Sequence, residues 1–242
     1  MPKYFVEPEN IKDNNIIITG EDVKHISTVL RAKLGDVLEV CNGCSEDFEC
    51  KIKEISKEQI ELEIVSKKPC YAEPKAKITL FQGLPKADKM ELIIQKCVEI
   101  GIDKIVPVAT ERSVVKLNDK EKIKKVERWQ KISLSAAKQS GRGIIPKIED
   151  VISYNEAIKV AKTMQKAIIF YENEAKRELK EILKNIKDEE IGIFIGPEGG
   201  FANEEINKAK TEGLETASLG ERVLRTETAA VVATAILLYE LG

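Results

Sequence analysis

The sequence predicts an α/β protein with a small β-rich N-terminal domain and a larger domain built on a mainly parallel sheet. Three observations support this prediction. Short β-rich or alternating segments fill residues 1–70. The stretch 66–74 contains two prolines and no periodicity, as a linker does. After it, strands alternate with helices, which is typical of a parallel sheet covered by helices. We therefore expect one domain at 1–70 and a second at 75–242.

Strand-like segments of the N-terminal region lie at 16–19, 36–41, 47–55 and 59–65. Turns between them are supplied by Gly20, Gly35 and Gly43. One helix is predicted at 21–31, with Val23, Ile26, Val29 and Leu30 on one face. Several short strands and one helix in so short a region predict a small β-barrel.

The larger region contains predicted strands at 78–81, 104–108, 167–171, 191–195 and 216–219. The fourth is apolar throughout, as a strand covered on both faces is. Asp88 with Glu91, and Ser153 with Glu156, have the spacing of capping boxes, and Gly101 is expected to end the first of these helices. A helix at 118–139 carries an apolar stripe that consists of Ile123, Val126, Trp129, Ile132 and Ala136.

The last predicted helix, at 227–239, is apolar on nearly every side. Such a helix must be covered on every side. Two interpretations have equal weight, a subunit interface or a helix at the centre of the core.

Composition excludes several classes of protein. No apolar run approaches the roughly 20 residues of a membrane span, and no secretory signal is visible at the N-terminus. The five cysteines are interpreted as reduced, which predicts a cytoplasmic protein. Net charge is −2, but residues 112–147 hold eleven Lys or Arg against three acids. This basic stretch could attract a polyanion, although a solvated helix face explains the charge more simply.

The strongest local motif is Gly196-Pro197-Glu198-Gly199-Gly200, directly after the apolar strand at 191–195. Ligands of open α/β sheets bind beyond the carboxyl ends of the strands, and glycines let a backbone approach a ligand closely. The loop holds a carboxylate and no Lys or Arg, so it suits a positively charged ligand such as a sulfonium better than a phosphate. A plain strand-to-helix turn would need only one glycine.

A second motif, residues 219–229, joins the last strand to the apolar helix. Thr226 is a plausible N-cap and Glu227 suits the first helical turn. Arg222 and Arg225 are poorly placed at a helix N-terminus, where the dipole disfavours cations. They therefore indicate contact with an anion or with developing negative charge.

Together the two motifs resemble the SPOUT methyltransferases and, more closely, the RsmE family of 16S ribosomal RNA uridine N3-methyltransferases. Other segments extend the resemblance over nearly the whole chain. Residues 25–36 resemble the family's PUA-like RNA-binding domain, 89–101 its first catalytic-domain helix and 128–142 its long basic helix. The resemblance implies a C-terminal trefoil knot, a homodimer with active sites at the interface, and S-adenosylmethionine as cofactor.

The resemblance and the motifs together give a set of expected site residues. Cofactor binding is expected at Ile195, Gly196, Pro197, Glu198, Gly199, Gly200, Leu219, Gly220, Leu224, Arg225, Thr226, Thr228 and Ala229. Contacts with 16S ribosomal RNA, within a small-subunit particle, are expected at His25, Arg31, Lys33, Lys89, Arg112 and Arg142. For His25, which lies on a short predicted helix, a structural role is an equal alternative to RNA contact.

The expected reaction is in-line methyl transfer to N3 of a uracil. Arg225 is expected to stabilise negative charge on the base, and Glu198 and Glu227 are the candidate bases or orienting groups. No metal is expected, because Cys41 and Cys44 have no second pair and the chain has one histidine. Alternatives are methylation of another RNA base or of a ribose 2′-hydroxyl, a non-catalytic RNA-binding protein, and a nucleotide-binding protein, the last disfavoured by the lack of a phosphate loop.

Overall fold

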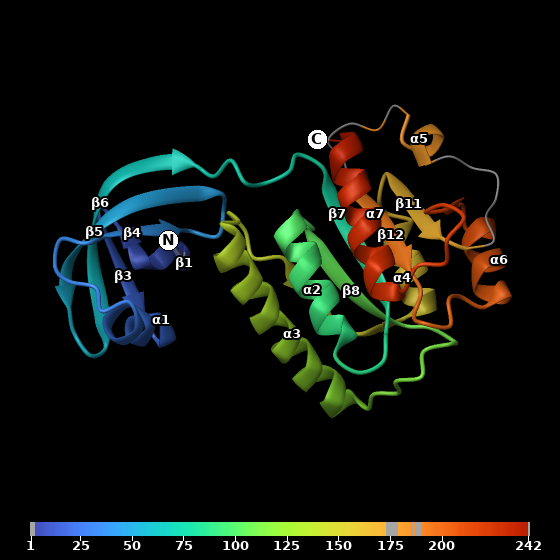
Figure 1. The fold of residues 1–242 in the computed structure, drawn as a ribbon, viewed down its shortest axis with the longest axis horizontal. Coiled ribbons are helices and arrows are strands. Elements are labelled where there is room, and N and C mark those ends of the chain that lie inside the picture. Colours follow the sequence, from blue (N-terminus) through green and yellow to red (C-terminus); the bar gives the residue numbers. More distant parts are fainter. Residues whose placement is uncertain (1–2, 173–178, 185, 187–189, 242) are drawn as a thin grey trace. The chain divides into compact units, whose positions relative to one another are not determined.

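The computed structural model describes residues 3–172, 179–184, 186 and 190–241. The chain divides into two compact units (Figure 1). The first runs to Glu73 and includes Ala137–Ile145, and the second consists of Pro74–Ala136 and the chain from Pro146 onward. Segment 137–145 thus belongs to the N-terminal unit, although it lies well beyond the sequence boundary predicted near residue 70.

The first unit contains a six-stranded sheet in the order β1-β4-β5-β6-β3-β2. Its pairs are antiparallel except β1 with β4. The strands are β1 (Lys3–Phe5), β2 (Ile11–Lys12), β3 (Asn15–Thr19), β4 (Val37–Cys41), β5 (Glu46–Ile55) and β6 (Gln59–Pro69). All four predicted segments are strands. β6 extends into the stretch predicted as a linker, because its residues up to Pro69 pair with β5.

The helical segment of this unit differs from its prediction. It consists of α1 (Glu21–Lys24) and a wider turn over His25–Val29, in which the Leu30 amide donates to the His25 carbonyl. Such a π-type turn adds a residue and rotates the next residues away from the previous face. Val23 and Ile26 are buried, whereas Val29 is 67% exposed and Leu30 39% exposed. The prediction of one apolar face is therefore wrong for Val29 and Leu30.

The second unit is built on a seven-stranded sheet whose pairs are all parallel, in the order β10-β8-β7-β12-β11-β13, with β9 paired to β8. This confirms the predicted parallel sheet. The strands are β7 (Lys77–Gly83), β8 (Lys104–Ala109), β9 (Lys147–Ile148), β10 (Ile152–Ser153), β11 (Lys166–Phe170), β12 (Glu190–Ile195) and β13 (Glu215–Ala217). The apolar strand β12 lies inside the sheet, between β7 and β11.

Helices cover both faces of this sheet (Figure 1). The described helices from residue 89 onward are α2 (Lys89–Ile100), α3 (Asp119–Ser140), α4 (Tyr154–Ala161), α5 (Leu179–Ile182), α6 (Asn203–Thr211) and α7 (Thr226–Leu241). One core cluster joins the sheet to apolar residues of α4 and α6. On the other side α7 packs against α2, β7 and β12.

Helix ends agree with the sequence signals in part. Ser153 and Glu156 form the predicted capping box, and Gly101 ends α2 with φ 125°. The capping box predicted at Asp88 is wrong. Asp88 has φ −90° and ψ 9° and makes no side-chain cap hydrogen bond, because its backbone is not in the extended conformation of an N-cap.

Two apolar stripes are less covered than predicted. On α3, Trp129 and Ala136 are buried but Ile123 is 58% exposed. On α7, one face is buried through Ala230, Ala233, Thr234 and Leu237. The opposite face is open, with Ile236 37% and Tyr239 86% exposed. The interpretation of α7 as a fully enclosed core helix is therefore wrong for the single chain. Within the described residues, no helix has both the length and the apolar character to cross a membrane.

Candidate active site

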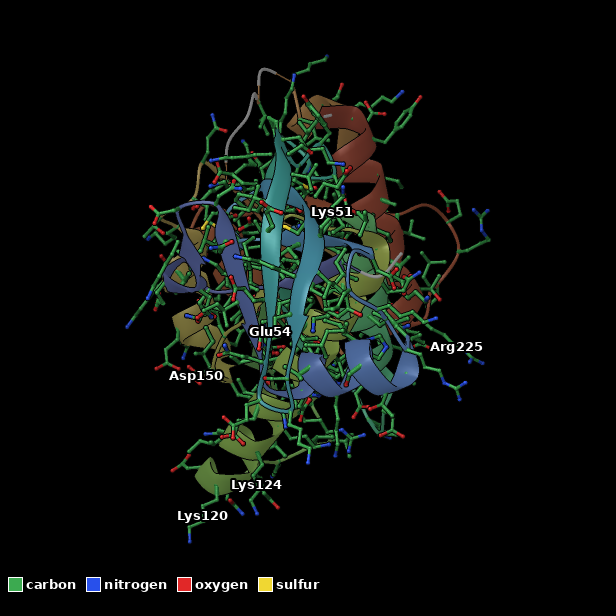
Figure 2. The ribbon with its side chains drawn as sticks, turned by 90° about the vertical axis from the view of Figure 1, so that its left-hand side faces the viewer. Lys51, Glu54, Lys120, Lys124, Asp150 and Arg225 are labelled. Carbon is green, nitrogen blue, oxygen red and sulfur yellow. The ribbon has the colours of Figure 1, made fainter. Side chains whose placement is uncertain are left out.

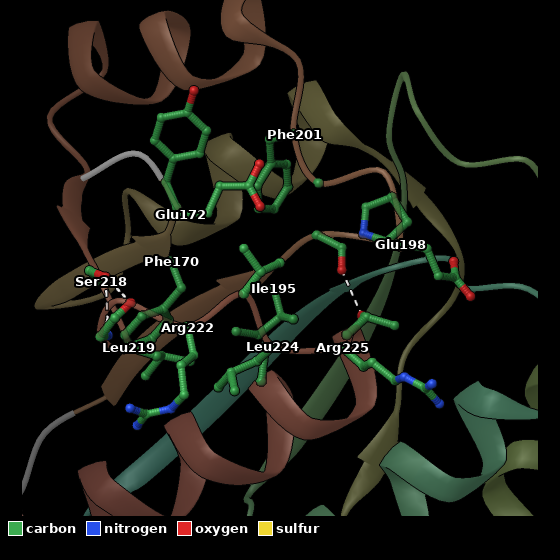
Figure 3. Close-up of a pocket in the computed structure, with 18 of the residues that line it drawn as sticks. Phe170, Glu172, Ile195, Glu198, Phe201, Ser218, Leu219, Arg222, Leu224 and Arg225 are labelled. Carbon is green, nitrogen blue, oxygen red and sulfur yellow. Dashed lines mark hydrogen bonds between the residues drawn. The ribbon is translucent and has the colours of Figure 1, made fainter. Parts of the chain in front are cut away.

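A pocket of about 390 Å³ opens in the second unit (Figure 3). It lies beyond the carboxyl ends of β11, β12 and β13, where open α/β sheets bind ligands. Its volume is within the range of small-molecule sites. The lining residues are Lys89, Phe170, Tyr171, Glu172, Ile195, Gly196, Pro197, Glu198, Gly200, Phe201, Ser218, Leu219, Gly220, Arg222, Val223, Leu224, Arg225, Thr226 and Ala229.

The glycine-rich loop after β12 is closely packed, both within itself and against the end of β7. A Cβ on Gly196 would lie 3.0 Å from the backbone of Gly200. A Cβ on Gly83, at the end of β7, would lie 2.6 Å from Cδ of Pro197. Gly200 has φ +65°, a conformation that favours glycine. The loop therefore presents bare backbone to the pocket because its own packing requires glycine.

Thr226 ties this loop to the start of α7. Its hydroxyl donates to the Gly196 carbonyl at 2.6 Å and accepts from Nε2 of the buried Gln82 at 2.9 Å. Thr226 is the first residue of α7, and its side chain bonds residues that follow β12 and lie in β7. The prediction of Thr226 as N-cap is therefore wrong, since its hydroxyl is hydrogen-bonded to the glycine-rich loop after β12.

The loop from Ser218 to Arg225 forms the opposite wall. Gly220 has φ +104°, and its amide donates to Oγ of Ser218 at 3.1 Å. Leu219 and Leu224 supply apolar surface, which Phe170 and Ile195 extend (Figure 3). The pocket thus combines apolar walls with exposed backbone groups, a combination that suits a ligand with both a flat apolar part and polar groups.

One lysine connects two of the acids predicted to be catalytic. Nζ of Lys89 lies 2.9 Å from Oε1 of Glu198 and 3.4 Å from Oε2 of Glu227. The backbone amide of Lys86 also donates to both oxygens of Glu198, at 3.1 and 3.3 Å. Burial disfavours the ionised form of Glu198, but these hydrogen bonds and the lysine charge outweigh burial and lower its pKa. Glu198 is therefore a stably ionised carboxylate.

Arg225 differs from Glu198 and Glu227 in its ion pairing. It lines the pocket and its side chain is exposed, and within the described residues it forms no ion pair with Glu198, Glu227 or any other acid. Both of those acids are instead paired with Lys89. A guanidinium at the rim of the pocket without an acidic partner is available to an anionic ligand or reacting group.

Most of the predicted cofactor-binding residues come together at this pocket. Gly199 and Thr228 are the exceptions. The carbonyl of Gly199 accepts from the Arg112 guanidinium at 2.9 Å, outside the pocket lining. Thr228 is exposed on the first turn of α7. Of the three residues predicted to be catalytic, Arg225 and Glu198 line the pocket, and Glu227 is beside it through Lys89.

Two residues predicted to bind RNA lie at this site. Lys89 is in the pocket wall, and Arg112 is hydrogen-bonded to the glycine-rich loop. The basic helix α3 presents solvated lysines at its N-terminal end, where Lys120 and Lys124 extend away from the helix (Figure 2). This agrees with the simpler explanation of its charge.

In the first unit, the structure contradicts the prediction at Arg142. This residue is 2% exposed, and its guanidinium donates to both carboxylate oxygens of Glu73 at 2.6 to 3.1 Å. It is therefore engaged in a buried ion pair and has no surface to offer to RNA. His25 is hydrogen-bonded through Nδ1 to the Tyr4 hydroxyl at 2.8 Å, which gives it a structural contact. Arg31 and Lys33 are exposed.

Sequence reasoning missed several lining residues, chiefly Phe170, Tyr171, Glu172, Phe201 and Ser218. The first three lie where β11 ends. A signal existed, since β11 was predicted as a strand of the parallel sheet and its carboxyl end meets the same edge as that of β12. Among the described residues, no three His, Cys, Asp or Glu side chains are grouped as a metal site would need.

Comparison with known proteins agrees with this geometry. The family model described as an RNA methyltransferase domain matches residues 72–238, and that of an RNA methyltransferase PUA domain matches 18–65. Ribosomal RNA small subunit methyltransferase E of Bacillus subtilis is 34% identical over 248 residues, which cover 99% of this chain and 97% of the relative.

Two solved structures are similar over the whole chain. Ribosomal RNA small subunit methyltransferase E from Neisseria gonorrhoeae, bound to S-adenosylmethionine, has a TM-score of 0.89 at 31% identity and covers 100% of this chain and 98% of its own. A methyltransferase from Legionella pneumophila, in complex with the same cofactor, has a TM-score of 0.88 at 31% identity, with 99% and 98% covered.

Proposed function

Because the chain belongs to the ribosomal RNA small subunit methyltransferase E family, we propose that it transfers a methyl group from S-adenosylmethionine to N3 of a uridine in 16S ribosomal RNA. One observation carries the proposal on this chain's own residues. A pocket of glycine backbone and apolar walls has, at its rim, an arginine without an acidic partner among the described residues. The first part suits the cofactor and the second suits a base that loses a proton.

The pocket residues fit S-adenosylmethionine. Leu219, Leu224 and Ile195 offer apolar surface for a purine, and the bare backbone at Gly196 offers polar groups at close range. Glu172 adds a lining carboxylate that is not the one paired with Lys89, and it suits the positive charge of the sulfonium. When bound, the cofactor supplies an electrophilic methyl group, so that an N3–carbon bond forms while the carbon–sulfur bond breaks and its electron pair goes to sulfur.

The chain's own residues then have separate tasks. Arg225 stabilises the negative charge that develops on the uracil as its N3 proton leaves, since a preorganised cation acts where charge forms. Glu198 or Glu227 accepts that proton or orients the base. The walls of the pocket hold donor and acceptor in line, which supplies much of the acceleration.

We further propose that the protein is a homodimer and that its C-terminal region forms the trefoil knot of the SPOUT fold. The support for a dimer is the open apolar face of α7, with Ile236 and Tyr239 exposed. A second copy would cover this face next to the pocket, because Thr226 and Ala229 at the start of the same helix line the pocket.

For the RNA substrate, we propose that the PUA domain contributes basic surface around Arg31 and Lys33, both exposed. Exposed lysines and arginines bind phosphates without reading sequence, so they position the RNA while the pocket selects the base.

The decisive experiment is nucleoside analysis of small-subunit ribosomal RNA from cells with and without this protein. We expect one N3-methyluridine to be absent from the deletion strain and restored by purified protein with cofactor. A missing ribose-methylated nucleoside, or another methylated base, would assign the protein to a different acceptor. Unchanged RNA would favour a non-catalytic RNA-binding role.

A further inference from the structure

One short segment of the first unit, residues 28–37, exposes several apolar side chains between the wider turn after α1 and the start of β4. The exposed large apolar residues of this segment are Val29, Leu30, Leu34 and Val37. Val29 is 67% exposed and Leu34 66%. Among the described residues up to Glu73, only two other large apolar side chains, Val65 and Tyr71, are exposed. Apolar side chains gathered in this way, unlike singly scattered ones, indicate a contact surface.

The backbone of this segment is held in a fixed conformation. The Gly35 amide donates to the Ile52 carbonyl at 2.8 Å, and the Ile52 amide donates to the Asp36 carbonyl at 2.9 Å. Oδ2 of Asp36 also accepts from the Lys33 amide at 2.7 Å. Arg31 has φ +52°, a conformation that is uncommon for residues other than glycine. The exposed side chains are therefore presented by an ordered backbone, which reduces the entropy lost when a partner binds.

The charges available on this segment are positive. Arg31 and Lys33 are exposed, and neither forms an ion pair with a described residue of the first unit. Asp36 is the one acid in residues 28–37, and its carboxylate is used by the Lys33 amide. Available cations beside aliphatic side chains are complementary to an anionic partner that has apolar faces of its own.

RNA offers such faces where its bases are unpaired. In an A-form duplex the bases are stacked on one another, so a protein meets mainly phosphates, 2′-hydroxyls and base edges. Unpaired bases expose flat faces that apolar side chains can cover. Residues 28–37 lie within 18–65, the part of the chain that matches an RNA methyltransferase PUA domain. RNA is therefore a better occupant of this surface than an acidic protein.

We propose that segment 28–37 binds an unpaired stretch of the substrate RNA, with Val29 and Leu34 against the faces of unstacked bases and Arg31 and Lys33 on the flanking phosphates. The inference rests on the proposed function and deepens it, because it assigns the structural class of RNA that the first unit takes. The cations contribute to binding of any RNA, whereas the aliphatic side chains contribute to binding of unpaired RNA alone.

The test uses two fluorescent probes, a mixed-sequence single-stranded RNA and a blunt RNA duplex with the same number of phosphates. Affinities are measured by anisotropy over a range of salt concentrations. Val29→Ser with Leu34→Ser should weaken binding of the single strand about tenfold and leave binding of the duplex unchanged. The slope of log affinity against log salt should stay as in wild type, because no phosphate contact is lost.

Two further variants serve as controls. Val29→Ile with Leu34→Met keeps the apolar surface and should bind both probes as wild type does. Val65→Ser removes an exposed valine of β6 from the same unit and should also bind as wild type does. All of these positions are exposed, so thermal melts should show unchanged melting temperatures.

The inference is overturned if wild type binds neither probe, if it binds both equally, or if the double serine variant keeps its affinity for the single strand. Loss of affinity for small ribosomal subunits, with unchanged binding of the single strand, would overturn it in favour of a protein partner. A wild type that prefers the single strand but makes no N3-methyluridine contradicts the proposed function alone. Normal methylation without that preference contradicts this inference alone.

Discussion

Individual residues of the pocket divide into those that shape it and those left free to react. Gly196 and Gly83 allow close packing of the loop, and Thr226 ties that loop to α7. Arg225 forms no ion pair with the described acids, and the two carboxylates that could have neutralised it are paired with Lys89. The competing interpretation, in which Arg225 only shapes the loops through Glu198 or Glu227, is therefore not supported by this geometry.

We predict that Arg225→Ala loses catalysis far more than cofactor binding. An interaction made mainly in the transition state lowers the chemical rate without changing ground-state affinity. Loss of one such group costs about 100- to 1,000-fold. Single-turnover methylation beside calorimetric cofactor titration measures both effects, with Lys159→Ala on the far helix α4 as control. A near-normal rate at saturating cofactor would rule out the catalytic role.

We predict that Gly196→Ala weakens cofactor binding by about tenfold or more, which corresponds to about 1.4 kcal/mol. The new Cβ would meet the Gly200 backbone at 3.0 Å, and the loop must move. Gly199→Ala is the matched control, because Gly199 lies outside the pocket lining and its Cβ would lie 3.3 Å from Cβ of Arg112. Calorimetry compares the two, and equal affinities would show that the loop backbone does not contact the cofactor.

At the scale of elements, α7 has two functions on two faces. Its inner face packs on α2 and the sheet, and its first turn closes the pocket. Its outer face is apolar and open. An open apolar face of this kind marks an interaction site, and continuity with the pocket makes a second copy of the chain the partner that we propose.

We predict that wild type is a dimer and that Ile236→Glu with Tyr239→Glu yields a folded monomer, because charges on the outer face must lose water on association. Light scattering at micromolar concentration measures the mass. Ile123→Glu, an equally drastic change at an exposed position of α3, should leave the dimer intact. A wild-type monomer would contradict the dimer and with it a shared active site.

At the scale of the whole molecule, each unit has its own basic groups, and burial separates structural from available charge. Arg142 and Glu73 form a buried pair that fastens segment 137–145 to the strand-rich unit. Arg31 and Lys33 are exposed on the same unit. Net charge and charge clusters along the sequence do not distinguish the two situations.

We predict that removing the exposed cations Arg31 and Lys33 changes RNA binding, whereas removing the buried Arg142 changes stability. Arg31→Ala with Lys33→Ala should weaken RNA binding and reduce the slope of log affinity against log salt by about one for each phosphate that the protein no longer neutralises, with an unchanged melting temperature. Arg142→Ala should lower the free energy of unfolding by about 3–5 kcal/mol, since it leaves Glu73 buried without its partner, and should leave the salt slope unchanged. Salt titrations and thermal melts test both, and a slope that falls only in Arg142→Ala would reverse the assignment.

The sequence alone determined the features that depend on neighbours along the chain. Alternation and apolar runs located four of the six described strands of the first sheet and five of the seven of the second, and glycine-rich and Leu-Gly turns located two walls of the pocket. Only the tertiary structure decided which distant groups meet. It paired Lys89 with Glu198 and Glu227, buried Arg142 against Glu73, turned Thr226 from a cap into a tie between loops, and left one face of α7 open. The reason is physical, since periodicity reports that a side chain is apolar or charged, whereas burial and ion pairing depend on the groups that the fold brings against it.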